Sequence, residues 1–174
     1  LDIVRIGHTK KFRSSLLVIN DPKITYIDYS FKTFKNLCTN GSLFIHHIFH
    51  EGKLLEGNPK KWRQFKVSFK VKSDLEKEIR EYSELITFLN SDPMFHQSTF
   101  PYLSNMFKAM KNISIFYLAS NLLYIFEKHD CIRKTYPFLC EKQIKLLIKA
   151  NDIFERGCNQ PKETDQDFEN LAIY

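Results

Sequence analysis

The stretch ITYIDYSFKTFKNLCTNGSLFIHHIFHEG, residues 24–52, decides the fold class because its pattern changes within a few residues. Residues 24–29 are rich in β-branched and aromatic side chains, which is typical of a strand. Residues 31–38 and 43–50 follow as two short helical patterns, separated by a turn that ends at Gly41. A strand followed by two short helices indicates a small α/β portion at this end of the chain.

On either side of this stretch, the sequence leaves some of the secondary structure open. Upstream, the apolar run at 16–19 predicts another strand, either in a hairpin with 24–29 or beside it in one sheet. Downstream, residues 53–72 hold seven basic residues and one acid. A short helix starting at Pro59 and an extended segment over 66–72, where apolar and polar residues alternate, are both compatible with that pattern.

After Ser73 the sequence becomes helical almost to its end. Ser73-Asp74-Leu75-Glu76 has the form of a capping box. Apolar residues recur with helical spacing further on. The predicted helices cover 73–89, 103–118 with a continuation over 121–128, and 138–156 with Phe154 facing inward.

The composition fits a globular protein. Of 174 residues, 43% are hydrophobic and 26% charged, and 16 Phe accompany only five Gly. We expect an α+β, mostly helical fold in which a partial sheet is followed by a helical bundle. The expected parts are an α/β portion over 1–72, a helical bundle over 73–158 and a polar, frayed tail over 159–174.

The net charge of +6 is unevenly distributed. The tail at 159–174 carries one Lys and four acids, so the rest carries 25 − 16 = +9, and 53–72 alone contributes 7 − 1 = +6. Such a distribution favours a polyanionic partner, a nucleotide or a nucleic acid. No apolar run reaches the roughly 20 residues of a membrane span. Four widely spaced cysteines give neither a zinc motif nor a disulfide framework, so we expect buried thiols and a cytoplasmic location.

The strand ending Ile27-Asp28-Tyr29 and the segment GSLFIHHIFHEGKLL at 41–55 resemble the polymerase-β-like nucleotidyltransferases. More narrowly, they resemble the bacterial members with a helical C-terminal domain of the HEPN type. The resemblance implies transfer of a nucleoside monophosphate from a triphosphate such as ATP, with Mg²⁺ as cofactor. It makes Asp28 the third metal-binding, catalytic carboxylate. The nearby cations for phosphate binding are Lys53, Lys60, Lys61 and Arg63.

The chain departs from this family at its decisive motif. No Gly-Ser turn followed by D-x-D precedes Asp28, and Gly41-Ser42 comes after it without paired acids. A lone carboxylate does not assemble a two-metal site. Because the sequence begins at Leu1 without Met, we expect either a fragment whose motif lies upstream or a degenerate copy, inactive as this chain.

Other interpretations of the same residues stay open. Asp28 is alternatively a strand acid at a sheet edge or a partner for a neighbouring Lys. His46 and His50 share one helix face, and structural histidines are favoured there over a metal site. The segment 53–72, with Trp62 and Phe65 as stacking residues, can bind nucleic acid, although a solvated lysine face with the aromatic side chains turned inward is favoured.

The helical half adds a further hypothesis. It predicts a HEPN-like member of a toxin–antitoxin pair that acts through a homodimer or a protein partner. The R-x4-6-H pattern of RNA-cutting members is missing, since no His follows Arg133 at that spacing.

Overall fold

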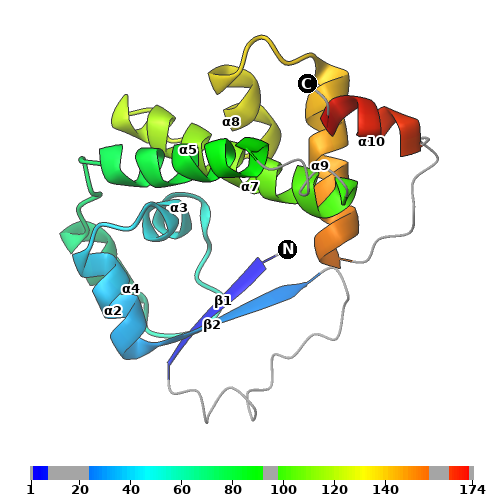
Figure 1. The fold of residues 1–174 in the computed structure, drawn as a ribbon. Coiled ribbons are helices and arrows are strands. Elements are labelled where there is room, and N and C mark those ends of the chain that lie inside the picture. The colour runs from blue at the N-terminus through cyan, green and yellow to red at the C-terminus, as the bar shows by residue number, and fades with distance from the viewer. Residues whose placement is uncertain (1, 8–23, 92–97, 157–164, 173–174) are drawn as a thin grey trace. The chain divides into compact units, whose positions relative to one another are not determined.

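A computed structural model describes residues 2–7, 24–91, 98–156 and 165–172. The chain divides into two compact units, residues 1–72 and 73–174 (Figure 1). The sequence pattern places a boundary at the same position. The expected fold class is confirmed, because the described residues are mostly helical and include one small parallel sheet.

The sheet of the first unit consists of β1 (Asp2–Gly7) and β2 (Thr25–Ser30), which run parallel. Their register places Arg5 opposite Asp28. Parallel strands need a crossover connection rather than a hairpin turn. The strand predicted at 16–19 falls outside the described residues.

The described residues of the first unit also form three helices, α2 (Phe31–Thr39), α3 (Leu43–Glu51) and α4 (Pro59–Ser68). Their apolar faces meet in an aromatic cluster around Phe34 and Phe49. The α4 helix begins at Pro59 because the Asn58 side chain accepts hydrogen bonds from two first-turn amides. Of the two alternatives for the basic segment, the helix starting at Pro59 is correct, and the described residues after it form no strand.

The turn between α2 and α3 requires glycine at position 41. Gly41 has φ +66°, and its carbonyl accepts a hydrogen bond of 2.9 Å from the Lys72 amide. A Cβ at this position would lie 2.4 Å from the Lys72 nitrogen and 2.7 Å from the Lys70 carbonyl oxygen. The backbone after α4 is therefore held against this turn, which closes the unit.

The second unit contains α5 (Glu76–Ser91), α7 (Thr99–Ser120), α8 (Lys128–Thr135), α9 (Glu141–Arg156) and α10 (Asp165–Ala172). The long helix α7 contacts the other four, so it forms the centre of this bundle (Figure 1). The core is built from side chains on every helix. It includes Leu89, Leu103, Phe107, Ile132, Ile144, Leu147 and Phe168.

The predicted continuation of α7 over 121–128 is wrong. The Leu122 amide donates to the Ala119 carbonyl and the Leu123 amide to the Leu118 carbonyl, both at 2.9 Å. These bonds form a Schellman motif with Leu122 at φ 61°, a position where glycine is usual. A leucine gives no sequence signal of a helix end, and this explains the wrong prediction.

Three further predictions for this half need correction. The first helix begins at Glu76, three residues after the predicted start. The Asp74 carboxylate accepts a hydrogen bond from the Glu76 amide. The α9 helix begins at Glu141 rather than at Phe138, whose side chain is exposed. Phe154 is also largely exposed instead of facing inward.

The predicted frayed tail is wrong for residues 165–172. They form α10, which contacts α7 and α9. Phe168 is fully buried, and its ring centroid lies 5.1 Å from that of Phe100. A single aromatic residue among polar ones anchors this helix, whereas the overall polarity of the segment indicated a tail. Residues 159–164 lie outside the described residues.

In the described part of the chain, no helix combines the length and apolar character that crossing a bilayer requires.

Candidate functional site

Asp28 is engaged by an arginine on the neighbouring strand. Arg5 Nε lies 2.6 Å from Asp28 Oδ1, and Arg5 Nη2 lies 2.8 Å from Oδ2, so the pair is bidentate. Hydrogen bonding to this carboxylate raises the pKa of Arg5, whose guanidinium also lies 4.6 Å above the ring of Tyr26. Both Asp28 oxygens thus bind a cation, as in the alternative interpretation of this residue, but the partner is Arg5 and not a lysine. Within the described residues, Asp28 belongs to no group of three potential metal ligands.

Three of the four predicted phosphate-binding cations lie together on α4. Lys60, Lys61 and Arg63 line a shallow groove of about 830 Å³ along this helix. Phe31, the first residue of α2, lines it as well. The remaining lining residues are Gln64, Phe65, Val67 and Ser68. Lys53, the fourth predicted cation, precedes α4 and does not line the groove.

The groove is electropositive because its cations have no acidic partner in the part of the chain that the structure describes. Among residues 2–7, 24–91, 98–156 and 165–172, Lys60, Lys61 and Arg63 form no ion pair, and no carboxylate lines the groove. The first turn of α4 contains no acid either. Two lysines there add to the positive end of the helix dipole, where an anion would be favourable. An anion entering the groove therefore meets several uncompensated positive charges.

The two aromatic residues predicted to stack on bases are used in the core instead. The Trp62 ring lies 4.9 Å from that of Phe49, edge to face. Phe65 contacts Phe34 at 5.5 Å with an interplanar angle of 81°. Both residues pack against the buried aromatic cluster of the first unit. The favoured interpretation, in which the aromatic side chains turn inward, therefore agrees with the structure, and the alternative of base stacking by Trp62 and Phe65 does not.

Phe31 is the aromatic residue that the groove exposes. Its side chain is 48% exposed, and its ring packs edge-on against Phe65 at 5.9 Å. Ser30 caps α2 by accepting the Thr33 amide, which fixes the start of the helix beside β2. Sequence reasoning missed Phe31 because only the packing of α2 on α4 brings it to the groove. Sequence reasoning also did not single out Gln64, which lies on α4 between Arg63 and Phe65.

A second lysine-lined hollow, of about 340 Å³, lies on α9. Here at least two of the cations have carboxylate partners. Lys145 Nζ lies 3.2 Å from Glu141 Oε1, and Lys142 Nζ lies 2.7 Å from Asp167 Oδ1 on α10. The other lining residues are Leu146 and Lys149. In these pairs, carboxylates offset the lysine charges. The α9 hollow is therefore less electropositive than the α4 groove.

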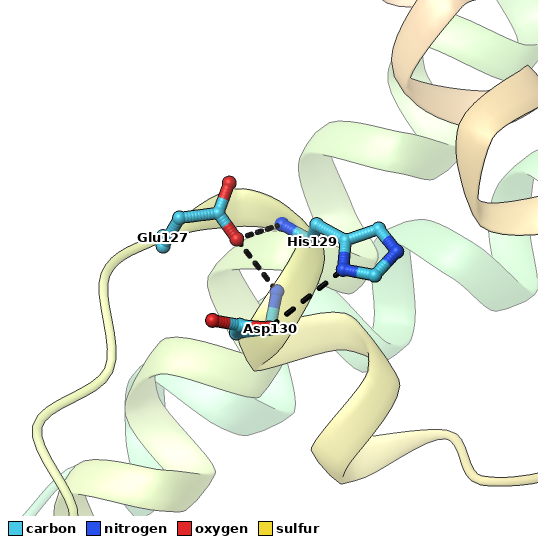
Figure 2. Close-up of side chains that lie close together, drawn as sticks. All are labelled: Glu127, His129 and Asp130. Carbon is cyan, nitrogen blue, oxygen red and sulfur yellow. Dashed lines mark hydrogen bonds and ion pairs between the residues drawn. The ribbon is translucent and has the colours of Figure 1, made fainter. Parts of the chain in front are cut away.

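One group of potential metal ligands occurs among the described residues, at the start of α8 (Figure 2). It consists of Glu127, His129 and Asp130. Glu127 Oε2 accepts the amides of His129 at 2.8 Å and Asp130 at 2.7 Å, as a helix N-cap does. His129 Nε2 lies 2.9 Å from Glu141 Oε1. The cluster is explained by helix capping and by an ion-pair connection between α8 and α9.

Two histidines of α3 stack on each other at the margin of the aromatic cluster, where His46 is half-buried and His50 is exposed. The rings of His46 and His50 are stacked, with centroids 5.8 Å apart and an interplanar angle of 13°. Burial, followed by the neighbouring His50 and His47, lowers the pKa of His46. His46 also packs against Phe69. A neutral imidazole in an aromatic environment is the structural interpretation favoured by the sequence.

The described cysteines form no disulfide. Cys131 is fully buried, and this burial raises the pKa of its thiol to about 11, so it is unreactive at neutral pH. Cys140 is exposed and Cys38 is half-buried, so the prediction of buried thiols holds for Cys131 alone. Cys158 lies outside the described residues.

No family model, curated protein or solved structure matches this chain.

Proposed function

We propose that the first unit binds the sugar–phosphate backbone of nucleic acid in the α4 groove. The observation that carries this proposal is a set of three cations that line the groove and have no acidic partner among the described residues, Lys60, Lys61 and Arg63. Phosphate contacts supply most of the non-specific affinity of such proteins, since each contact releases condensed counterions. Three contacts correspond to a salt-dependence slope of about −2 on single strands.

Nucleotide transfer is less well supported by the same geometry. That reaction uses carboxylates to bind two divalent ions. Asp28, the one predicted metal ligand, gives both oxygens to Arg5. In the part of the chain that the structure describes, no second and third ligand gather beside it. Binding through α4 requires no such set, and it is the function that the arrangement favours.

The test is a fluorescence-anisotropy titration of the whole chain with a labelled oligonucleotide. The groove variant combines Lys60→Gln, Lys61→Gln and Arg63→Gln. The matched control combines Lys142→Gln, Lys145→Gln and Lys149→Gln, which removes the same charge from the α9 hollow. At about 0.1 M salt, loss of three phosphate contacts weakens binding by roughly 100-fold.

We expect the groove variant to show this loss and the α9 variant to stay within about threefold of the wild type. Equal losses in both variants would mean that net charge alone drives binding. An unaffected groove variant, or a wild type without affinity, would contradict the proposal. Fluorescence of Trp62, the single tryptophan of the chain, reports whether the first unit of each variant is folded.

A further inference from the structure

Phe31 is an exposed ring held in a fixed position. About half of this residue is exposed, while its ring contacts that of Phe65 at an interplanar angle of 69°. Phe65 in turn packs edge-on against Phe34, which is 1% exposed. Offset and edge-to-face ring contacts of this kind are favourable and directional. The ring is therefore anchored to the core at one side and open at the other, so it loses little freedom when a ligand covers it.

The position of this ring relative to the cations has a chemical consequence. Phe31 lines the same groove as Lys60, Lys61 and Arg63. A ligand that fills the groove offers anionic groups to the cations and a flat, apolar face to the ring. A nucleotide unit in a single strand combines both, because its phosphate is charged and its base is unpaired.

We infer that the α4 groove binds single-stranded nucleic acid, with an unpaired base stacked on Phe31. This inference rests on the proposed function and specifies its substrate class. In a duplex, each base face is covered by the next base pair, and an exposed ring gains nothing there. Stacking of one base on an aromatic side chain contributes about 1–3 kcal/mol by alanine substitution, independently of sequence. The ring thus adds affinity for single strands without base specificity.

Acidic peptide is the competing occupant, since carboxylates also pair with lysine and arginine. The observations favour nucleic acid because the groove joins its cations to an exposed aromatic face, and a run of acidic side chains makes no use of that face. Gln64 also lines the groove and carries an amide donor and acceptor suited to a base edge. Polyglutamate therefore serves as a competitor in the test.

The experiment compares two labelled oligonucleotides with the same number of phosphates. One is a single strand of about 12 nucleotides, within the usual range of such sites, and the other is a hairpin duplex. Each is titrated with the wild type, with Phe31→Leu and with Phe138→Leu. Leucine keeps an apolar side chain but removes the aromatic face. Phe138 is a suitable control because it is exposed on the second unit.

We expect Phe31→Leu to weaken single-strand binding by roughly 5- to 100-fold and to leave duplex binding and the salt slope unchanged. Phe138→Leu should bind both oligonucleotides like the wild type. Duplex binding as tight as single-strand binding, or an unaltered Phe31→Leu variant, would overturn the inference while leaving the proposed function intact. Absence of binding to either oligonucleotide would overturn both. Displacement by polyglutamate at equal charge would show an acidic-peptide site instead.

Discussion

The lysines of α4 and those of α9 face different surroundings. Each helix lines a surface hollow with lysine side chains. On α9, Lys142 and Lys145 lie within 3.2 Å of carboxylate oxygens of Asp167 and Glu141. Among the described residues, Lys60 and Lys61 on α4 form no such pair. Lysine content alone therefore does not distinguish a binding surface from a solvated helix.

The difference shows which lysine charges form ion pairs within the fold. An ion pair between helices gives a lysine a structural role, even when its contribution to stability is small. Two lysines in the first turn of α4 repel each other and oppose the helix dipole. Among the described residues of the first unit, no carboxylate pairs with these two lysines to compensate this cost, whereas an anionic ligand would.

The largest expected effect concerns α10, the helix whose Asp167 forms an ion pair with Lys142 of α9. Asp167 lies on α10, and the adjacent Phe168 is fully buried against Phe100. We predict that Phe168→Ala destabilises the second unit by about 3–5 kcal/mol, since it leaves a cavity in the core. Urea unfolding followed by circular dichroism measures this change. The exposed control Val67→Ala should stay within about 0.5 kcal/mol of the wild type. A comparable small change for Phe168→Ala would show that α10 does not belong to the core.

A smaller effect is expected at the start of α8. Glu127 accepts the amides of His129 and Asp130 (Figure 2), and loss of such a cap costs about 1 kcal/mol. We predict this loss for Glu127→Ala and a smaller one for Glu127→Gln, which keeps a hydrogen-bond acceptor. Thermal unfolding with and without Zn²⁺ provides the measurement. If Zn²⁺ stabilises the wild type but not Glu127→Ala, the cluster is a metal site and the capping interpretation fails.

Reversing one charge on α4 should separate binding from stability. Lys61→Glu places an acid in the first turn of the helix, which stabilises it by about 0.3–1 kcal/mol. The same change removes a cation from the groove, so nucleic-acid affinity should fall. Trp62 fluorescence during urea unfolding measures the first effect and anisotropy the second. A variant that is both less stable and weaker in binding would indicate that Lys61 has a structural role.

The smallest effect is a difference in acid sensitivity between the units. Burial lowers the pKa of His46, so the stability it contributes is present above the unfolded value of about 6.5 and is lost as pH falls through the folded pKa. In the second unit, the hydrogen bond from Lys145 lowers the pKa of Glu141, whose contribution is lost only in stronger acid. Between pH 7.5 and pH 5.5, we therefore expect the urea midpoint measured by Trp62 fluorescence to fall. The midpoint measured by circular dichroism should stay unchanged. The variant His46→Gln should reduce this shift, and an unchanged shift would exclude His46 as its source.

Much of the fold follows from local sequence patterns. The strand β2, the helices α2 and α3 and the start of α4 at Pro59 are indicated by side-chain pattern and helix-starting residues. The end of α7 is not predictable in this way, because Leu122 occupies a position that glycine usually marks. The helix α10 depends on one buried residue, Phe168, whose partners come from distant parts of the chain.

Part of the candidate site can likewise be predicted from the sequence, and part of it cannot. Charge spacing identifies Lys60, Lys61 and Arg63, since a run of cations is visible in the sequence itself. The proposed stacking residue, Phe31, is not identifiable from the sequence, because the burial of Trp62 and Phe65 and the exposure of Phe31 depend on how the helices pack. Aromatic residues within a basic segment are thus weak indicators of a nucleic-acid contact until their burial is known.

The salt dependence of single-strand binding tests the groove most directly. We predict that the logarithm of the association constant falls with the logarithm of salt concentration with a slope of about −2, as three phosphate contacts require. The Lys60→Gln, Lys61→Gln, Arg63→Gln variant should bring the slope close to zero, and the matched α9 variant should keep it. A wild-type slope near zero, or the same slope in all three proteins, would contradict phosphate binding by α4.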